Sequence, residues 1–140
     1  MGCSATKRHE LGLVAASVRY DGPSFRVVRA YLATRPTEPL EIWLVSGKFG
    51  VIRWNTPIDD YDQRMTPDAA AQFAPVLQAK LGRAMRSTSY TKVLVHLGKD
   101  YLPILSGGMF PLPPPTLVDF TAGGICQRLG QLKTWLHAGS

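Results

Sequence analysis

Two short apolar runs, each followed at once by glycine, constrain the fold of this chain most. They are EIWLVS at residues 41–46 and KVLVHL at residues 92–97, and both have the length of a buried β-strand. Stretches with helical spacing of apolar residues alternate with them. This alternation predicts one compact α/β domain over residues 1–140, with a short mixed or mainly parallel sheet flanked by helices. In such sheets ligands bind beyond the carboxyl ends of the strands.

The first helix is predicted from apolar periodicity. Phe25, Val28 and Tyr31 recur at helical spacing, so we expect a helix over residues 25–33. Ser24 is a favourable residue for its N-cap, because a serine hydroxyl can accept a hydrogen bond from the first helical turn.

The clearest helix follows Thr66, which we expect to be its N-cap. Pro67 suits the first helical position, and the pattern continues to residue 85. Pro75 lies inside this helix and is expected to kink or split it, because proline lacks the backbone N–H that a helix interior uses.

The other segments are expected to be shorter. Residues 47–54 are predicted to be a loop, residues 100–107 a short helix, and residues 107–120 a loop with a short extended part. The chain closes with an amphipathic helix whose apolar stripe consists of Ile125, Leu129, Leu132, Trp135 and Leu136.

Composition excludes several classes of protein. The hydrophobic fraction is 45% and the charged fraction 19%, as in ordinary globular domains. No apolar run approaches the roughly 20 residues of a membrane span, and the start is too polar for a secretory signal. Two cysteines are too few for a disulfide framework. We therefore expect a cytoplasmic protein that does not contact a membrane and has no metal site and no cofactor.

The net charge of +6 has two interpretations of equal weight. A positive excess suits a phosphate, nucleotide or nucleic-acid partner, because neutralised phosphates release counterions. It also suits plain solubility, since the basic residues are scattered along the chain.

The first ten residues, MGCSATKRHE, allow three interpretations. They match the pattern for N-terminal myristoylation, which would make them a signal for attachment to a membrane. They also place Cys3, Ser4 and Lys7 in a small-residue turn, where a thiolate could act as a nucleophile or an amine could hold an anion. A frayed terminus with an accidental thiol is the third interpretation.

The segment Ser46-Gly47-Lys48-Phe49-Gly50 follows the first apolar run. Its glycines would let backbone N–H groups approach an anion, and Lys48 would supply a positive charge. The Walker A spacing is absent, and a glycine turn with a solvated lysine is an equally good interpretation.

Asp59, Asp60 and Asp62 surround Tyr61. Carboxylates this close together can furnish a general base or hold a divalent cation, although no EF-hand spacing is present and a solvated loop is the simpler explanation. The ring of Tyr61 in a polar loop indicates stacking on a ligand or insertion into the core.

Two further features concern the second half of the chain. His96 lies inside an apolar run, which favours a hydrogen-bonded strand histidine over a catalytic base. Gly123 and Gly124 at the start of the last helix, with the hydroxyl of Thr121, could seat an anion, or could simply be a flexible N-cap.

Six segments in this order resemble the DUF6884 proteins of bacteria and phages, which are described as related to the YaaA peroxide-stress proteins. The segments are GCSATK, RYDGPSFRVVRAY, WLVSGKFGVI, IDDYDQRM, LGKDY and GGICQRLGQL. The resemblance covers nearly the whole chain. It departs from the family pattern where Ser46-Gly47-Lys48 replaces Ser-Ala-Lys and where Asp59-Asp60 replaces a proline-containing turn.

The resemblance implies the handling of a nucleobase. YaaA proteins are described as DNA-binding, and the Cys3-to-Lys7 element is distantly similar to a motif of archaeosine synthase, which acts on a 7-deazaguanine base in tRNA. It implies catalytic roles for Cys3, Lys7, Lys48 and Tyr61. Substrate-binding roles are expected for Ser4, Tyr20, Arg29, Ser46, Arg64, Gly124 and Arg128.

Three functions are consistent with these observations. The preferred one is a small nucleobase- or nucleotide-processing enzyme, acting on a modified 7-deazaguanine-type base in nucleic acid or as a free nucleotide. The first alternative is a non-catalytic DNA-binding module that uses the scattered arginines. The second alternative is a hydrolase of an N-glycosidic bond, with one of the clustered aspartates activating water.

Overall fold

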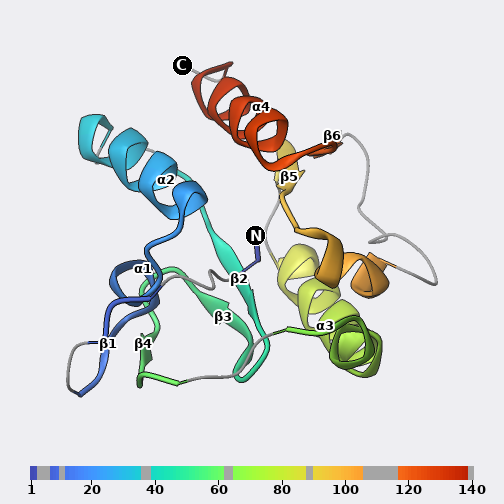
Figure 1. Ribbon diagram of the computed structural model, residues 1–140. Coiled ribbons are helices and arrows are strands. Elements are labelled where there is room, and N and C mark those ends of the chain that lie inside the picture. Colours follow the sequence, from blue (N-terminus) through green and yellow to red (C-terminus); the bar gives the residue numbers. More distant parts are fainter. Residues whose placement is uncertain are drawn as a thin grey trace.

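The computed structural model describes residues 1–2, 7–9, 12–35, 39–61, 65–87, 90–105 and 117–138. These ranges form a mixed α/β domain, which confirms the predicted fold class (Figure 1). The elements in chain order are β1 Val14–Ala15, α1 Ala16–Arg19, α2 Pro23–Thr34, β2 Trp43–Ser46, β3 Gly50–Arg53, β4 Pro57–Ile58, α3 Pro67–Ser87, β5 Lys92–Val95, the 3-10 helix η1 Lys99–Leu105, β6 Leu117–Phe120 and α4 Ile125–Ala138.

The strands are short and form three pairs. β2 and β3 make an antiparallel hairpin in which Ser46 lies opposite Gly50. β1 and β4 are also antiparallel, whereas β5 and β6 are parallel, with Val95 opposite Phe120. The strands of the described residues are therefore short and mixed in direction. This matches the mixed arrangement among the two that were predicted, and not the mainly parallel one.

Met1 and Gly2 connect β2 to β5. The amine of Met1 donates to the carbonyl of Trp43 at 2.6 Å, and the N–H of Val45 donates to the carbonyl of Met1 at 2.9 Å. Gly2 forms a parallel bridge with Val45 and donates its N–H to the carbonyl of His96 at 3.1 Å. The carboxyl ends of β2 and β5 therefore meet at Gly2, in the middle of the molecule (Figure 1).

Three groups of buried side chains hold the elements together. One packs α3 and η1 against β2 and β3, and one lies around Tyr20, Phe25 and Leu44. The third joins α2 to α4, which lie side by side in Figure 1, through Val28 and Leu132 and their buried neighbours. Ile125, placed in the apolar stripe of α4 by the sequence, lies outside this contact and is 57% exposed.

Two boundary predictions near β2 and α2 are wrong. Helix α2 begins at Pro23 with Gly22 as N-cap, and Ser24 lies inside its first turn. The hydroxyl of Ser24 instead bonds the ring of His96 at 2.8 Å, a partner 72 positions away. Residues 50–53, expected to be loop, form β3, because the chain reverses at Gly50 with a φ of 69° and pairs with β2.

Helix α3 starts as predicted, since the hydroxyl of Thr66 accepts the N–H of Ala69 at 3.1 Å. It runs without a break through Pro75, so the predicted split is wrong. Pro75 is exposed on the outer surface, while the opposite side of α3 packs against η1 and β3. Tertiary packing of that side outweighs the hydrogen bond that proline removes.

None of the helices in the described ranges is long and apolar enough to cross a membrane.

Candidate functional site

Three buried hydroxyl groups meet beyond the carboxyl end of β2. The hydroxyls of Tyr20 and Tyr61 share a short hydrogen bond. The Oγ of Ser46 lies 3.2 Å from the hydroxyl of Tyr61 and 3.4 Å from that of Tyr20. Tyr20 and Ser46 are fully buried, and Tyr61 is 8% exposed. Each hydroxyl can donate one proton and accept two, so the three groups can exchange donor and acceptor roles without losing contact.

The turn after β2 orients the hydroxyl of Ser46. Its Oγ accepts the backbone N–H groups of Lys48 at 3.2 Å and of Phe49 at 3.1 Å. These two bonds hold the oxygen beside the tyrosines, where it also accepts a hydrogen bond from the hydroxyl of Tyr20. The sequence feature that produces this arrangement is a serine at the last position of a strand, directly before a glycine turn.

Two lysines lie around the ring of Tyr61. The Nζ of Lys7 is 4.4 Å from the ring centroid, and that of Lys48 is 5.7 Å away. The edge of the Phe49 ring meets the same tyrosine at a centroid distance of 5.2 Å and an angle of 89°. An ammonium group over an aromatic face is attracted by the negative charge density of the ring, so both positive charges lie beside the ring that carries one of the three hydroxyls.

Neither lysine takes part in an ion pair among the described residues. Lys48 is exposed, and Lys7 is half-buried beside Tyr20, with which its backbone forms an antiparallel bridge. The cluster of Lys7, Tyr20, Ser46, Lys48 and Tyr61 therefore combines positive charge with connected hydroxyl groups. We call it the lysine–tyrosine cluster.

Arg19 holds the loop that carries Lys7. Its side chain is fully buried and donates to the carbonyls of Arg8 at 2.9 Å, Gly12 at 2.6 Å and Ile58 at 3.3 Å. The N–H of Arg8 in turn donates to the carbonyl of Arg19 at 2.7 Å. Arg19 was not singled out from the sequence, because nothing in its neighbours distinguishes a buried arginine from a solvated one.

The lysine–tyrosine cluster unites five of the residues expected from the sequence. Cys3, Ser4 and Arg64 lie outside the described residues. Phe49 contacts the ring of Tyr61 and was not predicted to be a site residue. Its position between Gly47 and Gly50 in the turn after the strand could have indicated that it lies near the site.

Arg29 has a different place from the expected one. Its Nη1 donates to the carbonyls of Ser17 at 2.7 Å and Tyr20 at 3.0 Å, and its Nη2 pairs closely with the carboxylate of Asp21. The hydrogen bond from Arg26, together with Arg29, lowers the pKa of Asp21 below its usual value. Arg29 thus links α2 to α1 and holds the backbone of Tyr20 through a hydrogen bond to its carbonyl.

The acidic segment beside Tyr61 is engaged at its surface. Asp60 accepts a hydrogen bond from the ring of His9 at 2.7 Å, which lowers the pKa of that carboxyl. Asp59 is exposed, and Asp62 lies outside the described residues. No group of three histidine, cysteine, aspartate or glutamate side chains in the described part of the chain is arranged to hold a metal ion.

A second polar group lies beyond the carboxyl ends of β5 and β6. His96 is buried, and its two ring nitrogens bond the hydroxyls of Ser24 at 2.8 Å and Thr121 at 3.0 Å. Burial, followed by the charges of the terminal amine and of Arg128, lowers the pKa of His96 to about 4. The ring is therefore neutral at pH 7, and it is the hydrogen-bonded strand histidine that the sequence indicates.

Arg128 and Gly124 lie near this second group. The Nη1 of Arg128 donates to the carbonyl of Leu97 at 3.0 Å. The N–H of Gly124 donates to the side-chain oxygen of Gln127 at 3.0 Å, so this N–H has an acceptor within its own helix. Arg128 lines a cavity together with His96, whereas Gly124, which belongs to the anion seat expected at the start of α4, does not line it.

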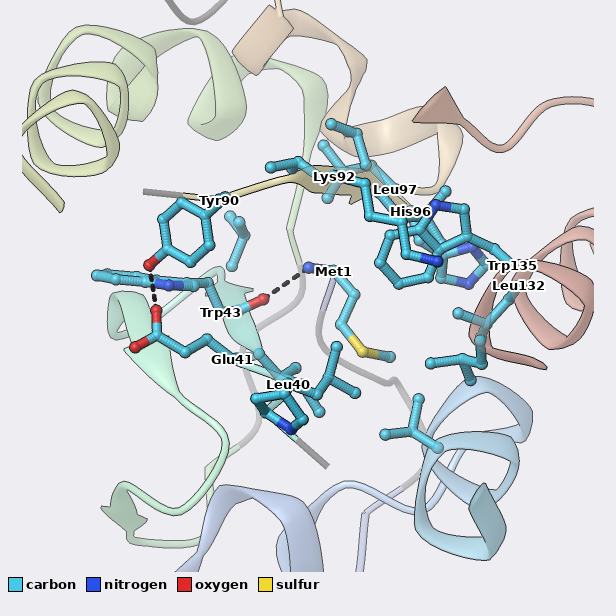
Figure 2. A pocket seen from close by; sticks show the side chains of 18 of the residues that line it. Met1, Leu40, Glu41, Trp43, Tyr90, Lys92, His96, Leu97, Leu132 and Trp135 are labelled. Atoms are coloured by element: carbon cyan, nitrogen blue, oxygen red, sulfur yellow. Dashed lines mark hydrogen bonds between the residues drawn. The ribbon is translucent and has the colours of Figure 1, made fainter. Parts of the chain in front are cut away.

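A larger, apolar cavity of about 190 Å³ lies between β2 and β5. Figure 2 shows Met1 crossing it, with Trp43 and Glu41 on one side and His96 and Leu97 on the other. Most of its walls are aliphatic or aromatic, and two of its polar side chains, Tyr90 and Glu41, bond each other. This cavity suits an apolar group and offers little that could carry out a reaction.

Comparison of the chain with protein-family models, with curated proteins and with solved structures finds no match. The resemblance to DUF6884 proteins therefore stays a prediction.

Proposed function

We propose that this protein is a small cytoplasmic enzyme that processes a nucleobase or nucleotide, with the lysine–tyrosine cluster as its reaction centre. The observation that carries the proposal is the position of the Lys7 ammonium over the ring of Tyr61, whose hydroxyl is bonded to Tyr20 and Ser46. The resemblance to DUF6884 proteins supports a modified 7-deazaguanine-type base as the substrate.

The cluster can supply two kinds of assistance to a reaction. The ammonium groups of Lys7 and Lys48 can stabilise negative charge that develops on a substrate atom, since both lie at the same ring. The connected hydroxyls of Tyr20, Ser46 and Tyr61 can pass a proton from one oxygen to the next without rearranging the side chains.

Support for the DNA-binding alternative is weaker. Arg19 and Arg29, which belong to the scattered basic residues, direct their guanidinium groups to backbone carbonyls inside the protein. Support for an N-glycosidic hydrolase is weaker as well, because Asp60 is paired with His9 at the surface.

The test is turnover of a panel of nucleotides and deazaguanine nucleotides, followed by mass spectrometry of the products. We expect Lys48→Ala to lower turnover by about 100-fold or more, because one stabilising charge is removed from the transition state. Since Lys48 is exposed, the variant should keep the melting temperature of the unmodified protein.

Lys133→Ala is the matched control, because Lys133 is an exposed lysine on α4. It should leave turnover unchanged. Equal turnover by Lys48→Ala and the unmodified protein, with a substrate that the protein converts, would sink the proposal.

A further inference from the structure

A small polar cavity lies at the carboxyl ends of β5 and β6, apart from the lysine–tyrosine cluster. It is lined by Gly2, Ser24, His96, Gly98, Tyr101 and Arg128, with apolar side chains of α4 beside them. Its volume is about 130 Å³. One water molecule needs about 10–15 Å³ on this measure, so the cavity has room for a polyatomic ion.

The lining of this cavity carries a positive charge, because it includes Arg128 and no carboxylate among the described residues. None of the ion pairs of the described residues includes Arg128. A guanidinium group in a polar cavity whose described walls hold no acidic side chain attracts an anion.

Arg128 also has a donor without an acceptor. Its Nη1 is bonded to the carbonyl of Leu97, but its Nε is buried and has no hydrogen-bond partner among the described residues. A buried donor that lacks an acceptor destabilises the folded protein, so such groups are rare unless a ligand or water completes them.

Ser24 can become a second donor through the tautomer of His96. When the proton is on Nε2, the ring donates to the Oγ of Ser24, and the hydroxyl proton of Ser24 is directed elsewhere. The Nδ1 then accepts the hydroxyl proton of Thr121. An anion in the cavity would favour this tautomer, because only then can Ser24 donate to it.

We propose that the cavity lined by Ser24, His96 and Arg128 binds a phosphate-type oxyanion, with Arg128 and Ser24 as its donors. The inference that this anion is the phosphate of a nucleotide substrate rests on the proposed function. The binding of a free oxyanion does not.

The first measurement is a calorimetric titration of the full chain with inorganic phosphate. We expect saturable binding in the unmodified protein, about tenfold weaker binding in Arg128→Gln, and weaker binding in Ser24→Ala. Ser24→Ala keeps the bond from Arg128 to Leu97, so it tests the cavity even if Arg128→Gln loses stability. Arg83→Gln, which removes an exposed arginine of α3, should bind as the unmodified protein does.

The second measurement is long-range ¹H–¹⁵N NMR of the His96 ring. Phosphate should raise the fraction of the ring protonated on Nε2, a change that a non-specific surface ion would not cause. Absence of binding, equal binding by all three variants, or an unchanged ring tautomer at saturation would overturn the proposal.

The proposed function and this site can fail separately. Lys48→Ala should bind phosphate normally even though it turns over substrate poorly. Phosphate binding without any turnover would contradict only the proposed function, whereas turnover of nucleosides and nucleotides without phosphate binding would contradict only the anion site. A nucleoside monophosphate that competes with phosphate, when its nucleoside does not, would identify the ligand's phosphate as the occupant.

Discussion

At the scale of single residues, Arg19 and Arg29 show how the fold uses charge. Arg29 was expected to bind a substrate and Arg19 was one of the scattered basic residues, yet the guanidinium groups of both bind carbonyl oxygens of the chain itself. A planar guanidinium has five donors in a fixed arrangement, so one side chain can fasten three separate backbone segments. Periodicity does not reveal this use, because the carbonyls come from other elements.

Replacement of Arg19 by methionine should destabilise the fold by about 3 kcal/mol. The variant leaves the carbonyls of Gly12 and Ile58 without the buried charged donor that they have now. Urea denaturation measures the change. Arg26→Met is the control, because Arg26 is exposed and pairs only with Asp21 among the described ion pairs; an equal loss in both variants would contradict the role of Arg19.

At the scale of elements, the β2–β3 hairpin places Ser46, Lys48 and Phe49 around Tyr61. The hairpin depends on Gly50, which closes the turn at a φ of 69°. The sequence shows the two glycines of this turn, but glycines at this spacing are equally compatible with an unpaired loop and with a β-hairpin. Only the pairing of residues 50–53 with β2 distinguishes them, and Val51 of β3 packs in the same core as Ala70 and Leu77 of α3.

Gly50→Ala should destabilise the protein by about 1–2 kcal/mol, because an L-residue is strained at a positive φ. Its surroundings are open, so the effect is not steric. The matched variant is Gly130→Ala in the interior of α4, where the added methyl group also meets open space. It should stabilise by up to about 1 kcal/mol. Thermal unfolding compares them, and a shift of the same sign in both would argue against the backbone explanation.

At the scale of the whole molecule, His96 is a junction between the two ends of the chain. Its carbonyl accepts the N–H of Gly2, and its ring bonds Ser24 of α2 and Thr121 after β6. The burial that makes this junction possible also lowers the pKa of the ring to about 4. The unfolded chain, with a histidine pKa near 6.5, therefore binds a proton that the folded protein excludes.

Stability should consequently fall with acidification between about pH 6.5 and pH 4. Above pH 6.5 the ring of His96 is neutral in both the folded and the unfolded protein, so the free energy of unfolding is highest there. As the pH falls from 6.5 to 4, the unfolded chain binds a proton and the free energy of unfolding decreases by about 3 kcal/mol. Below pH 4 the ring is protonated in both states, so this group causes no further loss. Urea titrations at several pH values measure it. His96→Gln should flatten the dependence in this window, whereas His137→Gln, an exposed control, should keep it.

Local sequence patterns correctly predict the fold class, the start of α3 and the strand character of β2 and β5. These properties depend on neighbours along the chain: apolar spacing, the cap at Thr66 and the apolar runs before glycine. Five of the expected site residues also come together. They come from the start of the chain, the end of α1, the turn after β2 and the segment after β4, and these segments do not follow strands of one common sheet.

The tertiary structure alone decided which polar groups touch. Tyr20 and Tyr61 are 41 positions apart, and Ser24 and His96 are 72 apart, so no local pattern encodes either contact. It also decided that Arg29 faces the backbone and that Ser24 bonds a histidine in place of capping its helix. Buried hydrogen bonds need an exact partner at short range, and that partner exists only after the strands have brought distant segments together.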